Sequence, residues 1–308
     1  MTFDRVSASL ISVCIIVAAC NRDRKPVGAD SATVLTPPVV QPTTPGANTG
    51  WNSEESGPVM LLTGQENTPN AAVVLPWLTD STLASSRAFV LDSLSNMPVD
   101  LFNRTGTTGS SALVVSSQAP STEGCLAWPT GVLSPPPREW RFGLRKGVAT
   151  ALPLDSLEGM TPSDSSQVTV EIARMASVVA EGSDPAFRGL PFGVRRAYRF
   201  SLGSSSVLIG DVVRKINEEA NPREERLLLI AERATGGDGK YVVAFESRVA
   251  DSEEDVRTSE VLGAVRFVRG NPTIVVRFEY DEGGNSALIE RTGEKQWRIT
   301  WRSAYTGC

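Results

Sequence analysis

The sequence predicts an α+β fold that is predominantly antiparallel β, with one capped helix at about 162–181 and a C-terminal β-meander. Three observations lead to this prediction. Short apolar runs are separated by clusters of Gly, Pro, Asn, Ser and Thr, as in β-rich domains. The last third of the chain alternates apolar and polar residues with the period of two that half-buried strands require. One segment near the middle repeats apolar residues at helical spacing.

The first half of the predicted globular body contains four short apolar runs. They lie at 59–62, 72–75, 88–91 and 112–115, and turn-forming residues separate them. Runs of this length are typical of strands, because helices in globular proteins are usually longer. We therefore expect strands at all four positions.

The helix at about 162–181 is predicted from its cap and its apolar stripe. Thr161 can accept a hydrogen bond from a free amide, Pro162 suits the first helical position, and Asp164 places a carboxylate near the positive end of the helix. Apolar residues then recur at intervals of four, three and four, at Val168, Ile172, Met175 and Val179. Gly182 is expected to end the helix.

From about 195 onward we expect a meander of six or seven strands. Alternation places three sets of residues each on one face of a strand: Val261, Gly263, Val265 and Phe267; Ile274, Val276, Phe278 and Tyr280; and Trp297, Ile299 and Trp301. Such strands have one buried and one wet face, as is common in antiparallel sheets. The segment 211–220 fits either a strand end or a short helix.

Tight connections are predicted between these strands. Gly, Asn, Asp and Pro cluster at 236–239, 270–272, 281–284 and 292–294. The glycine-rich stretch 235–240 falls between two strand-like runs and opens no helix, so a hairpin turn is favoured there over an anion-binding loop.

The first residues carry a different kind of pattern. An apolar run at 6–19 follows Arg5, ends in two alanines, and is followed by Cys20, Asn21 and several charged residues. As a helix it would span roughly 21 Å at about 1.5 Å per residue, short of the ~30 Å hydrocarbon core of a bilayer. A spanning helix is therefore not expected, whereas the hydrophobic region of a cleaved signal peptide has this length.

The residues Val17-Ala18-Ala19-Cys20 resemble the lipobox of bacterial lipoprotein signal peptides. This resemblance implies that residues 1–19 are removed and that Cys20 becomes the lipidated first residue, which attaches the protein to a membrane. In that family an Asn after the cysteine goes with export to the outer membrane, so Asn21 implies that destination in a host with two membranes. An ordinary secretory signal with an incidental cysteine is the alternative.

Residues 20–50 are predicted to form the lipidated cysteine and a tether. Proline recurs there among Thr, Val, Ala and Gly, at Pro26, Pro37, Pro38, Pro42 and Pro45. Proline at this density removes amide donors and favours extended backbone, so the segment cannot build a core. The alternative is a leader that packs on the body. The body itself is 51–308, either one unit or two packed halves, 51–155 and 156–308.

Charge and residue usage exclude several classes of function. The chain has 30 Lys and Arg against 35 Asp and Glu, and its basic residues are scattered, so nucleic acid binding is not expected. It has no histidine, which removes the usual general base and the usual zinc ligand. It also lacks Cys-x-x-Cys pairs, nucleophile elbows and phosphate-binding loops. We predict no cofactor and no catalytic residues.

Two cysteines of the body are candidates for a disulfide bond. Cys125 and Cys308 would be the only thiols left after lipidation of Cys20, because cleavage removes Cys14. An exported protein resides where thiols oxidise, so a bond between the two is predicted. Two free buried cysteines are the alternative.

Two further features, an acidic loop and the tryptophans, bear on ligand binding. Asp251, Glu253 and Asp255 are weak candidates for a calcium site, but the spacing of known calcium loops is missing, so no metal is predicted and a solvated loop is favoured. Tryptophans can form stacking platforms, and the chain has Trp51, Trp77, Trp128, Trp140, Trp297 and Trp301. The last two are expected in the core. Trp51, Trp128 and Trp140 are the better candidates for exposure, although packing is favoured for these three as well.

These observations lead to a functional expectation. The chain is expected to be a membrane-anchored lipoprotein of the cell envelope, with its body in the periplasm or at the surface, serving as a non-enzymatic binding or structural module. An envelope hydrolase using Asp and Glu carboxylates is one alternative. An assembly factor for a partner protein is the other. The sequence leaves the partner, protein or glycan, open.

Overall fold

The structure is a computed structural model, and its described residues belong to one compact unit, Thr44–Cys308. They are 59–63, 71–76, 94, 96–117, 130–179, 184–219, 221–234, 239–268, 270–280, 283–303 and 306–307. The predicted signal peptide, Cys20, Asn21 and the tether lie outside them. So do Cys125, Cys308, Gly182, the run at 88–91, and Trp51, Trp77 and Trp128.

The described chain is built mostly of antiparallel strands with one α-helix, which confirms the β-rich α+β prediction. The first strands close into a barrel in the order β1-β2-β5-β4-β3-β6. Its members are β1 (Val59–Thr63), β2 (Ala71–Pro76), β3 (Met97–Asn103), β4 (Gly106–Ser117), β5 (Thr130–Ser134) and β6 (Phe142–Arg145). Three of the four predicted runs are therefore strands, β1, β2 and β4.

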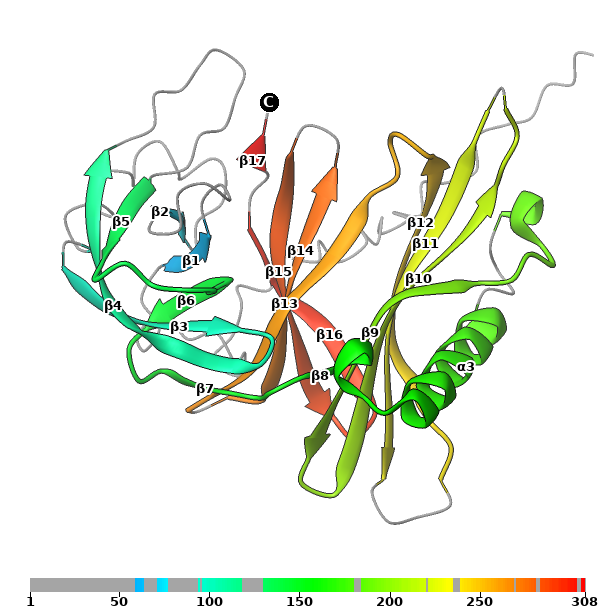
Figure 1. The fold of residues 1–308 in the computed structure, drawn as a ribbon, viewed down its shortest axis with the longest axis horizontal. Helices are drawn as coiled ribbons and strands as arrows, with labels where there is room; N and C mark the ends of the chain where they lie inside the picture. Colours follow the sequence, from blue (N-terminus) through cyan, green and yellow to red (C-terminus); the bar gives the residue numbers. More distant parts are fainter. Residues whose placement is uncertain are drawn as a thin grey trace, which may run out of the picture. The chain divides into compact units, whose positions relative to one another are not determined.

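The remaining strands form two open sheets (Figure 1). We call one the central sheet, and its strand order is β16-β15-β14-β13-β7. Its strands are β7 (Ala149–Ala151), β13 (Thr258–Phe267), β14 (Pro272–Tyr280), β15 (Gly283–Gly293) and β16 (Gln296–Arg302). The short strand β17 (Thr306–Gly307) pairs with β15. We call the other the helix-side sheet; it has the order β12-β11-β10-β9-β8, made of β8 (Asp155–Ser156), β9 (Gly193–Leu202), β10 (Ser205–Ile216), β11 (Arg223–Ala234) and β12 (Val242–Ser252).

The predicted single C-terminal meander is not confirmed. Strands β9 to β12 pair in chain order within the helix-side sheet, and β13 to β16 pair in chain order within the central sheet. In the part of the chain that the structure describes, no ladder joins β12 to β13. The ambiguous segment 211–220 is resolved as the end of β10, because Asp211 to Ile216 pair with β11 throughout.

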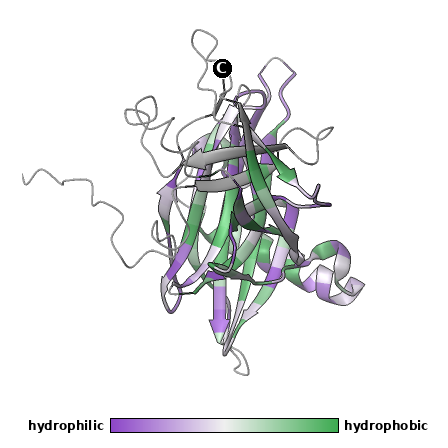
Figure 2. Cartoon of the chain, turned by 90° about the vertical axis from the view of Figure 1, so that its left-hand side faces the viewer, coloured by the Kyte–Doolittle hydropathy of each residue, from purple (hydrophilic) through white to green (hydrophobic). Residues whose placement is uncertain are grey.

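The helix is confirmed as α3 (Pro162–Val179). The Thr161 hydroxyl accepts a hydrogen bond from the amide of Asp164 at 3.2 Å, so Thr161 caps the first turn. The predicted stripe packs on the helix-side sheet: Val168, Ile172 and Met175 are buried and Val179 is partly buried. Short 3-10 turns flank it at η1 (Leu157–Gly159) and η3 (Pro185–Phe187). Hydropathy colouring shows both polar and apolar residues along this helix (Figure 2).

The two open sheets pack face to face and form a β-sandwich. The helix-side sheet supplies Tyr198, Phe200, Leu202, Val207, Ile209, Leu228 and Ile230, and the central sheet supplies Val261, Ala264, Ile274, Val276, Phe278, Ala287, Ile289 and Trp297. Phe200 and Trp297 meet edge to face, with ring centroids 6.4 Å apart. All of these side chains are buried, and the removal of their apolar surface from water is the main source of stability of the sandwich.

The opposite face of the central sheet is also covered. Leu262, Val265, Phe267, Val275, Leu288 and Trp301 pack with the barrel residues Leu62, Phe102, Phe142 and Leu144. One face of the strand at 274–280 was predicted to be exposed to solvent, and this prediction is wrong at Val275, which is fully buried. The apolar residues on both faces of β13 to β15 are explained by this two-sided burial.

Trp140 was a candidate for exposure for which packing was nevertheless favoured, and the structure shows it as a packing residue. Its side chain is buried with Leu94, Val99, Leu101, Leu113 and Leu133 in a separate cluster within the barrel. A short Pro-rich neighbourhood marks a turn in the backbone, but the tryptophan itself points back into the nearest core because burial of its large apolar surface is favourable.

Two β-bulges change which face a residue occupies. Leu288 pairs with Trp301 and Ile289 with Ile299, so Thr300 is an extra residue in β16. As a result Trp297 lies in the sandwich core while Trp301 lies on the barrel side. Both are buried as predicted, but the prediction that they share a face is wrong, because one inserted residue reverses the alternation. A bulge between Val261 and Gly263 does the same in β13.

Glu232 connects the two sheets of the sandwich through buried polar contacts. Its carboxylate lies on β11 and accepts two hydrogen bonds from the Arg291 guanidinium of β15, at 3.0 and 2.5 Å. Trp297 Nε1 and the Lys295 amide also donate to it, each at 3.3 Å. Burial raises the pKa of Glu232, but these donors outweigh burial, and the pKa lies below its ordinary value of 4.5.

Arg291→Met is expected to lower the free energy of unfolding at neutral pH by about 3 kcal/mol, because it leaves a buried carboxylate poorly paired. A lowered pKa in the folded state stabilises above the unfolded pKa and loses its effect as pH falls. The difference from the wild type should therefore shrink in acid. Urea unfolding of the wild type and of Arg291→Met, from neutral pH down into acid, measures the loss of stability and its dependence on pH. Arg298→Met, at an exposed position on β16, should change stability by less than about 0.5 kcal/mol, and an equal loss there contradicts the assignment.

Gly210 on β10 allows α3 to approach the sheet. A Cβ at this position would lie 2.6 Å from Ile172 Cγ2, inside the contact limit. Gly210→Ala should therefore lower stability by about 1–3 kcal/mol in urea unfolding. In the Gly210→Ala/Ile172→Ala chain the two losses should not add, because the clash is gone. Gly159→Ala, with its nearest neighbour atom at 3.8 Å, is the control. Full additivity would show that the approach of α3 is not the cause.

Candidate functional site

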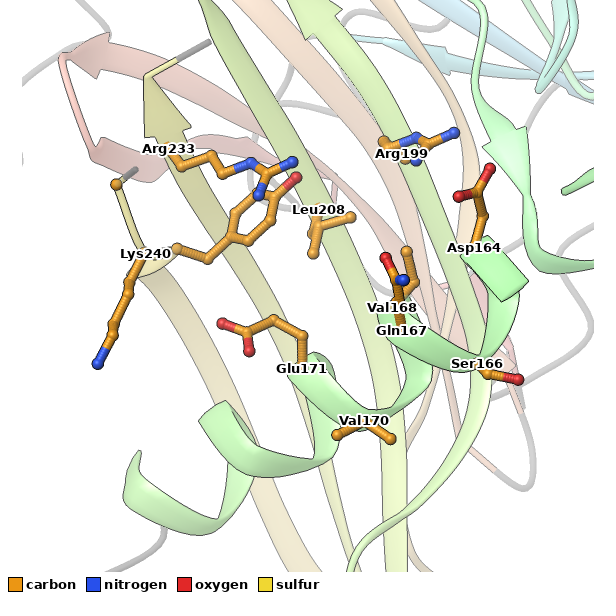
Figure 3. A pocket seen from close by; sticks show the side chains of 12 residues that line it. Asp164, Ser166, Gln167, Val168, Val170, Glu171, Arg199, Leu208, Arg233 and Lys240 are labelled. Atoms are coloured by element: carbon orange, nitrogen blue, oxygen red, sulfur yellow. The ribbon is translucent and has the colours of Figure 1, made fainter. Parts of the chain in front are cut away.

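A groove of about 560 Å³ lies between α3 and the helix-side sheet (Figure 3). Its lining comes from the first half of α3 (Asp164, Ser166, Gln167, Val168, Val170 and Glu171), from β9, β10 and β11 (Arg199, Leu208 and Arg233) and from the segment before β12 (Gly239, Lys240 and Tyr241). We call this the α3 groove. It combines an apolar interior with a few charged groups, which is the usual make-up of small-molecule sites.

The apolar part of the α3 groove is held in place by the core. Val168 of α3 and Leu208 of β10 are both buried and present only part of their surface to the groove. The Tyr241 hydroxyl lies 2.9 Å from the Ser206 hydroxyl, and this hydrogen bond fixes the tyrosine ring as a wall. The Arg233 guanidinium carbon lies 4.4 Å from the centre of that ring. This cation–π contact positions the arginine at the rim.

Charges are distributed unequally along the α3 groove. Arg233 and Lys240 come from the sheet side and lie toward the same end of the groove as Glu171 of α3 (Figure 3). Glu171 is bound by Arg174 through two hydrogen bonds, at 3.1 and 2.7 Å. These bonds, with smaller contributions from Arg233 and Lys240, hold the pKa of Glu171 below its ordinary value. Because Glu171 is already paired, the cations at this end are available to a ligand anion.

The other end of the α3 groove contains Asp164 and Arg199 (Figure 3). Arg199 lies 3.9 Å from Asp155, a weak and partly exposed ion pair. Asp164 and Glu171 are two helical turns apart, about 10 Å along the axis, which exceeds the roughly 5–9.5 Å between glycosidase carboxyl groups. The positions of these two acids along α3 do not match the spacing of glycosidase carboxyl pairs.

The acidic residues weighed as a calcium site do not gather around one point. The Ser252 hydroxyl donates to Asp255 at 2.6 Å, and the Ser252 amide donates to Asp251 at 2.8 Å. Glu253 pairs with Lys215 at 3.0 Å. Among the described residues, no group of three or more metal-ligating side chains is placed to hold an ion. The loop instead closes on itself through hydrogen bonds.

Sequence reasoning missed the α3 groove. The cap and stripe predicted the buried side of α3, but nothing in the sequence indicated that Gln167, Val170 and Glu171 face a hollow. The only local signal was the stretch 235–240, which ends in Lys240 and had been interpreted as a hairpin turn. That interpretation agrees with the antiparallel pairing of β11 with β12, and residues 235–238 lie outside the described part.

Comparisons with known proteins add no name to this site. No protein-family model matches the chain, and neither a curated protein nor a solved structure matches it. The described residues also include no helix of the length and apolar character needed to cross a membrane. The function therefore has to be argued from the sequence pattern at Cys20 and from the geometry of the described residues.

Proposed function

We propose that the protein is a lipoprotein of the bacterial cell envelope. The proposal rests on the lipobox resemblance of Val17-Ala18-Ala19-Cys20 and on the proline-rich segment that follows it. Cys20 carries the lipid, Asn21 directs the protein to the outer membrane, and the body lies in the periplasm or at the surface. In that compartment a Cys125–Cys308 disulfide joins the C-terminus to the first half of the body.

The body acts as a non-enzymatic binding module, and the α3 groove is its binding site. The observation that carries this is the position of Arg233 and Lys240 at the rim of a groove with an apolar interior of Val168, Leu208 and Tyr241. An apolar group would be buried in the interior, and an anionic head group would pair with the two cations. The ligand class that fits is a small amphipathic anion.

Binding of decanoate to the purified full chain tests this function. Calorimetric titration should detect binding of decanoate, and weaker binding of decyltrimethylammonium, which has a comparable chain but the opposite charge. Arg233→Gln/Lys240→Gln should weaken decanoate binding at least about tenfold, because both cations that face the head group are removed.

Arg298→Gln, at an exposed position on β16 that is not part of the α3 groove lining, removes one positive charge and is the control. It should leave decanoate affinity unchanged. Equal affinity for the anion and the cation, or no loss in the Arg233→Gln/Lys240→Gln chain, would show that the groove does not select anionic amphiphiles.

Lipidation of Cys20 has a separate test. When the gene is expressed in a bacterium supplied with radiolabelled palmitate, the protein should take up label and fractionate with membranes, because acyl chains contribute about 0.8 kcal/mol per buried methylene. Cys20→Ser should abolish both the label and the membrane association. Cys14→Ser, a cysteine within the predicted signal, should leave both intact. If the wild-type protein takes up no label, the lipoprotein proposal is wrong, whereas the proposed binding function of the α3 groove is unaffected.

A further inference from the structure

A second pocket, of about 510 Å³, lies where residues of the barrel and of both sheets of the sandwich meet. Four arginines line it: Arg104 and Arg141 from the barrel region, and Arg195 and Arg196 from β9. The central sheet contributes Glu260 of β13 and Glu279 of β14. We call it the arginine pocket. It shares no residue with the α3 groove, so it is argued independently of the function proposed above.

A β-bulge brings two consecutive arginines to the arginine pocket. Asp211 pairs with Arg196 and Val212 with Val194, so Arg195 is an extra residue in β9. In a regular strand, neighbours point to opposite faces, and only one of these two side chains would reach the pocket. The bulge redirects the alternation, and both line it. Bulges with this effect are frequent beside binding sites.

Arg104 is held rigidly at the wall of the arginine pocket. It lies in the turn between β3 and β4, where Asn103 Oδ1 accepts hydrogen bonds from the Thr105 amide and the Gly106 amide, at 2.9 and 3.1 Å. Its Nε donates to the Val261 carbonyl at 2.7 Å, and its Nη2 donates to Glu260 at 2.7 Å. These contacts order the guanidinium before any ligand arrives, which lowers the entropy cost of binding.

The carboxylates that line the arginine pocket are fewer than the arginines that line it. Arg104 and Arg141 share the same Glu260 oxygen, Arg141 at 3.2 Å. Glu279 is engaged by Arg277 outside the pocket lining, at 3.2 Å. Arg195 lies 3.9 Å from the buried Asp211, beyond hydrogen-bond distance. Arg196 interacts electrostatically with Asp211 and Glu158, two carboxylates outside the pocket lining. The lining has four guanidinium groups and two carboxylates, so the pocket is positive.

We propose that the arginine pocket binds the phosphate group of a phosphorylated small molecule. Planar guanidinium groups match the oxygens of phosphate through paired hydrogen bonds, and several arginines together favour a doubly charged group over a single carboxylate. Arg141, Arg195 and Arg196 are the ligand-binding residues. Glu260 forms ion pairs with Arg104 and Arg141 in the empty pocket, so its carboxylate competes with an incoming anion for these two arginines.

This proposal gives opposite expectations for two kinds of variant. In calorimetric titrations of the full chain with pyrophosphate, Arg195→Gln/Arg196→Gln should weaken binding at least about tenfold, because two positive groups are lost. Glu260→Gln should tighten binding about threefold, because it removes the competing negative charge while keeping a hydrogen-bond acceptor for Arg104. Decanoate affinity should stay unchanged in both chains, which separates this proposal from the function of the α3 groove.

A second variant and a second probe complete the test. Arg141→Gln, at a half-exposed position outside the β-bulge, should weaken pyrophosphate binding even if the β9 variant does not fold. Arg298→Gln should have no effect. Dihexanoyl phosphatidate carries the same group on a lipid: tighter binding than pyrophosphate assigns the site to lipid headgroups, and weaker binding assigns it to soluble phosphates. No binding of either probe to the wild type, or weaker binding in Glu260→Gln, overturns the proposal.

Discussion

The structure depends on the burial of both faces of the central sheet. One face packs against the helix-side sheet, with Phe200 meeting Trp297, and the other packs against barrel residues such as Phe142. A sheet in this position must be apolar on both sides, and β13 to β15 have that character. The helix-side sheet is likewise covered on its outer face by α3. The α3 groove lies between α3 and the outer face of the helix-side sheet, and the arginine pocket lies where residues of the barrel and of the sandwich meet.

The buried Glu232 of the sandwich has several hydrogen-bond partners, whereas cations outnumber the carboxylates in the lining of both pockets. Glu232 receives hydrogen bonds from the Arg291 side chain, the Lys295 amide and the Trp297 indole, and it serves to hold two sheets together. In the α3 groove, by contrast, Arg233 contacts an aromatic ring at the rim. In the arginine pocket, guanidinium groups outnumber the carboxylates that line it. An excess of one sign at an accessible position costs stability unless a ligand compensates it, and this is the physical basis for proposing anions as the ligands of both pockets.

Bulges account for most of the differences between the predicted and observed arrangement of side chains. Simple alternation predicts that Trp297 shares a face with Trp301 and that Arg195 is opposed to Arg196. The extra residues in β16 and β9 change both relations. Because the period of a strand is two, a single inserted residue moves every following side chain to the other face. A bulge depends on the register between two paired strands, which the alternation within either strand does not reveal.

The sequence by itself determined the local elements: the cap at Thr161, the stripe of α3, and most of the strands, because caps and periodicity act through neighbouring residues. It also carries a pattern at Cys20 that resembles a lipobox, and this resemblance depends on adjacent residues alone. Only the tertiary structure decided that the late strands divide into two sheets, that Trp140 is buried, and that Arg104 and Arg196 line one pocket. These are contacts between residues distant along the chain. They are set by which apolar faces cover one another, and no local pattern encodes that choice.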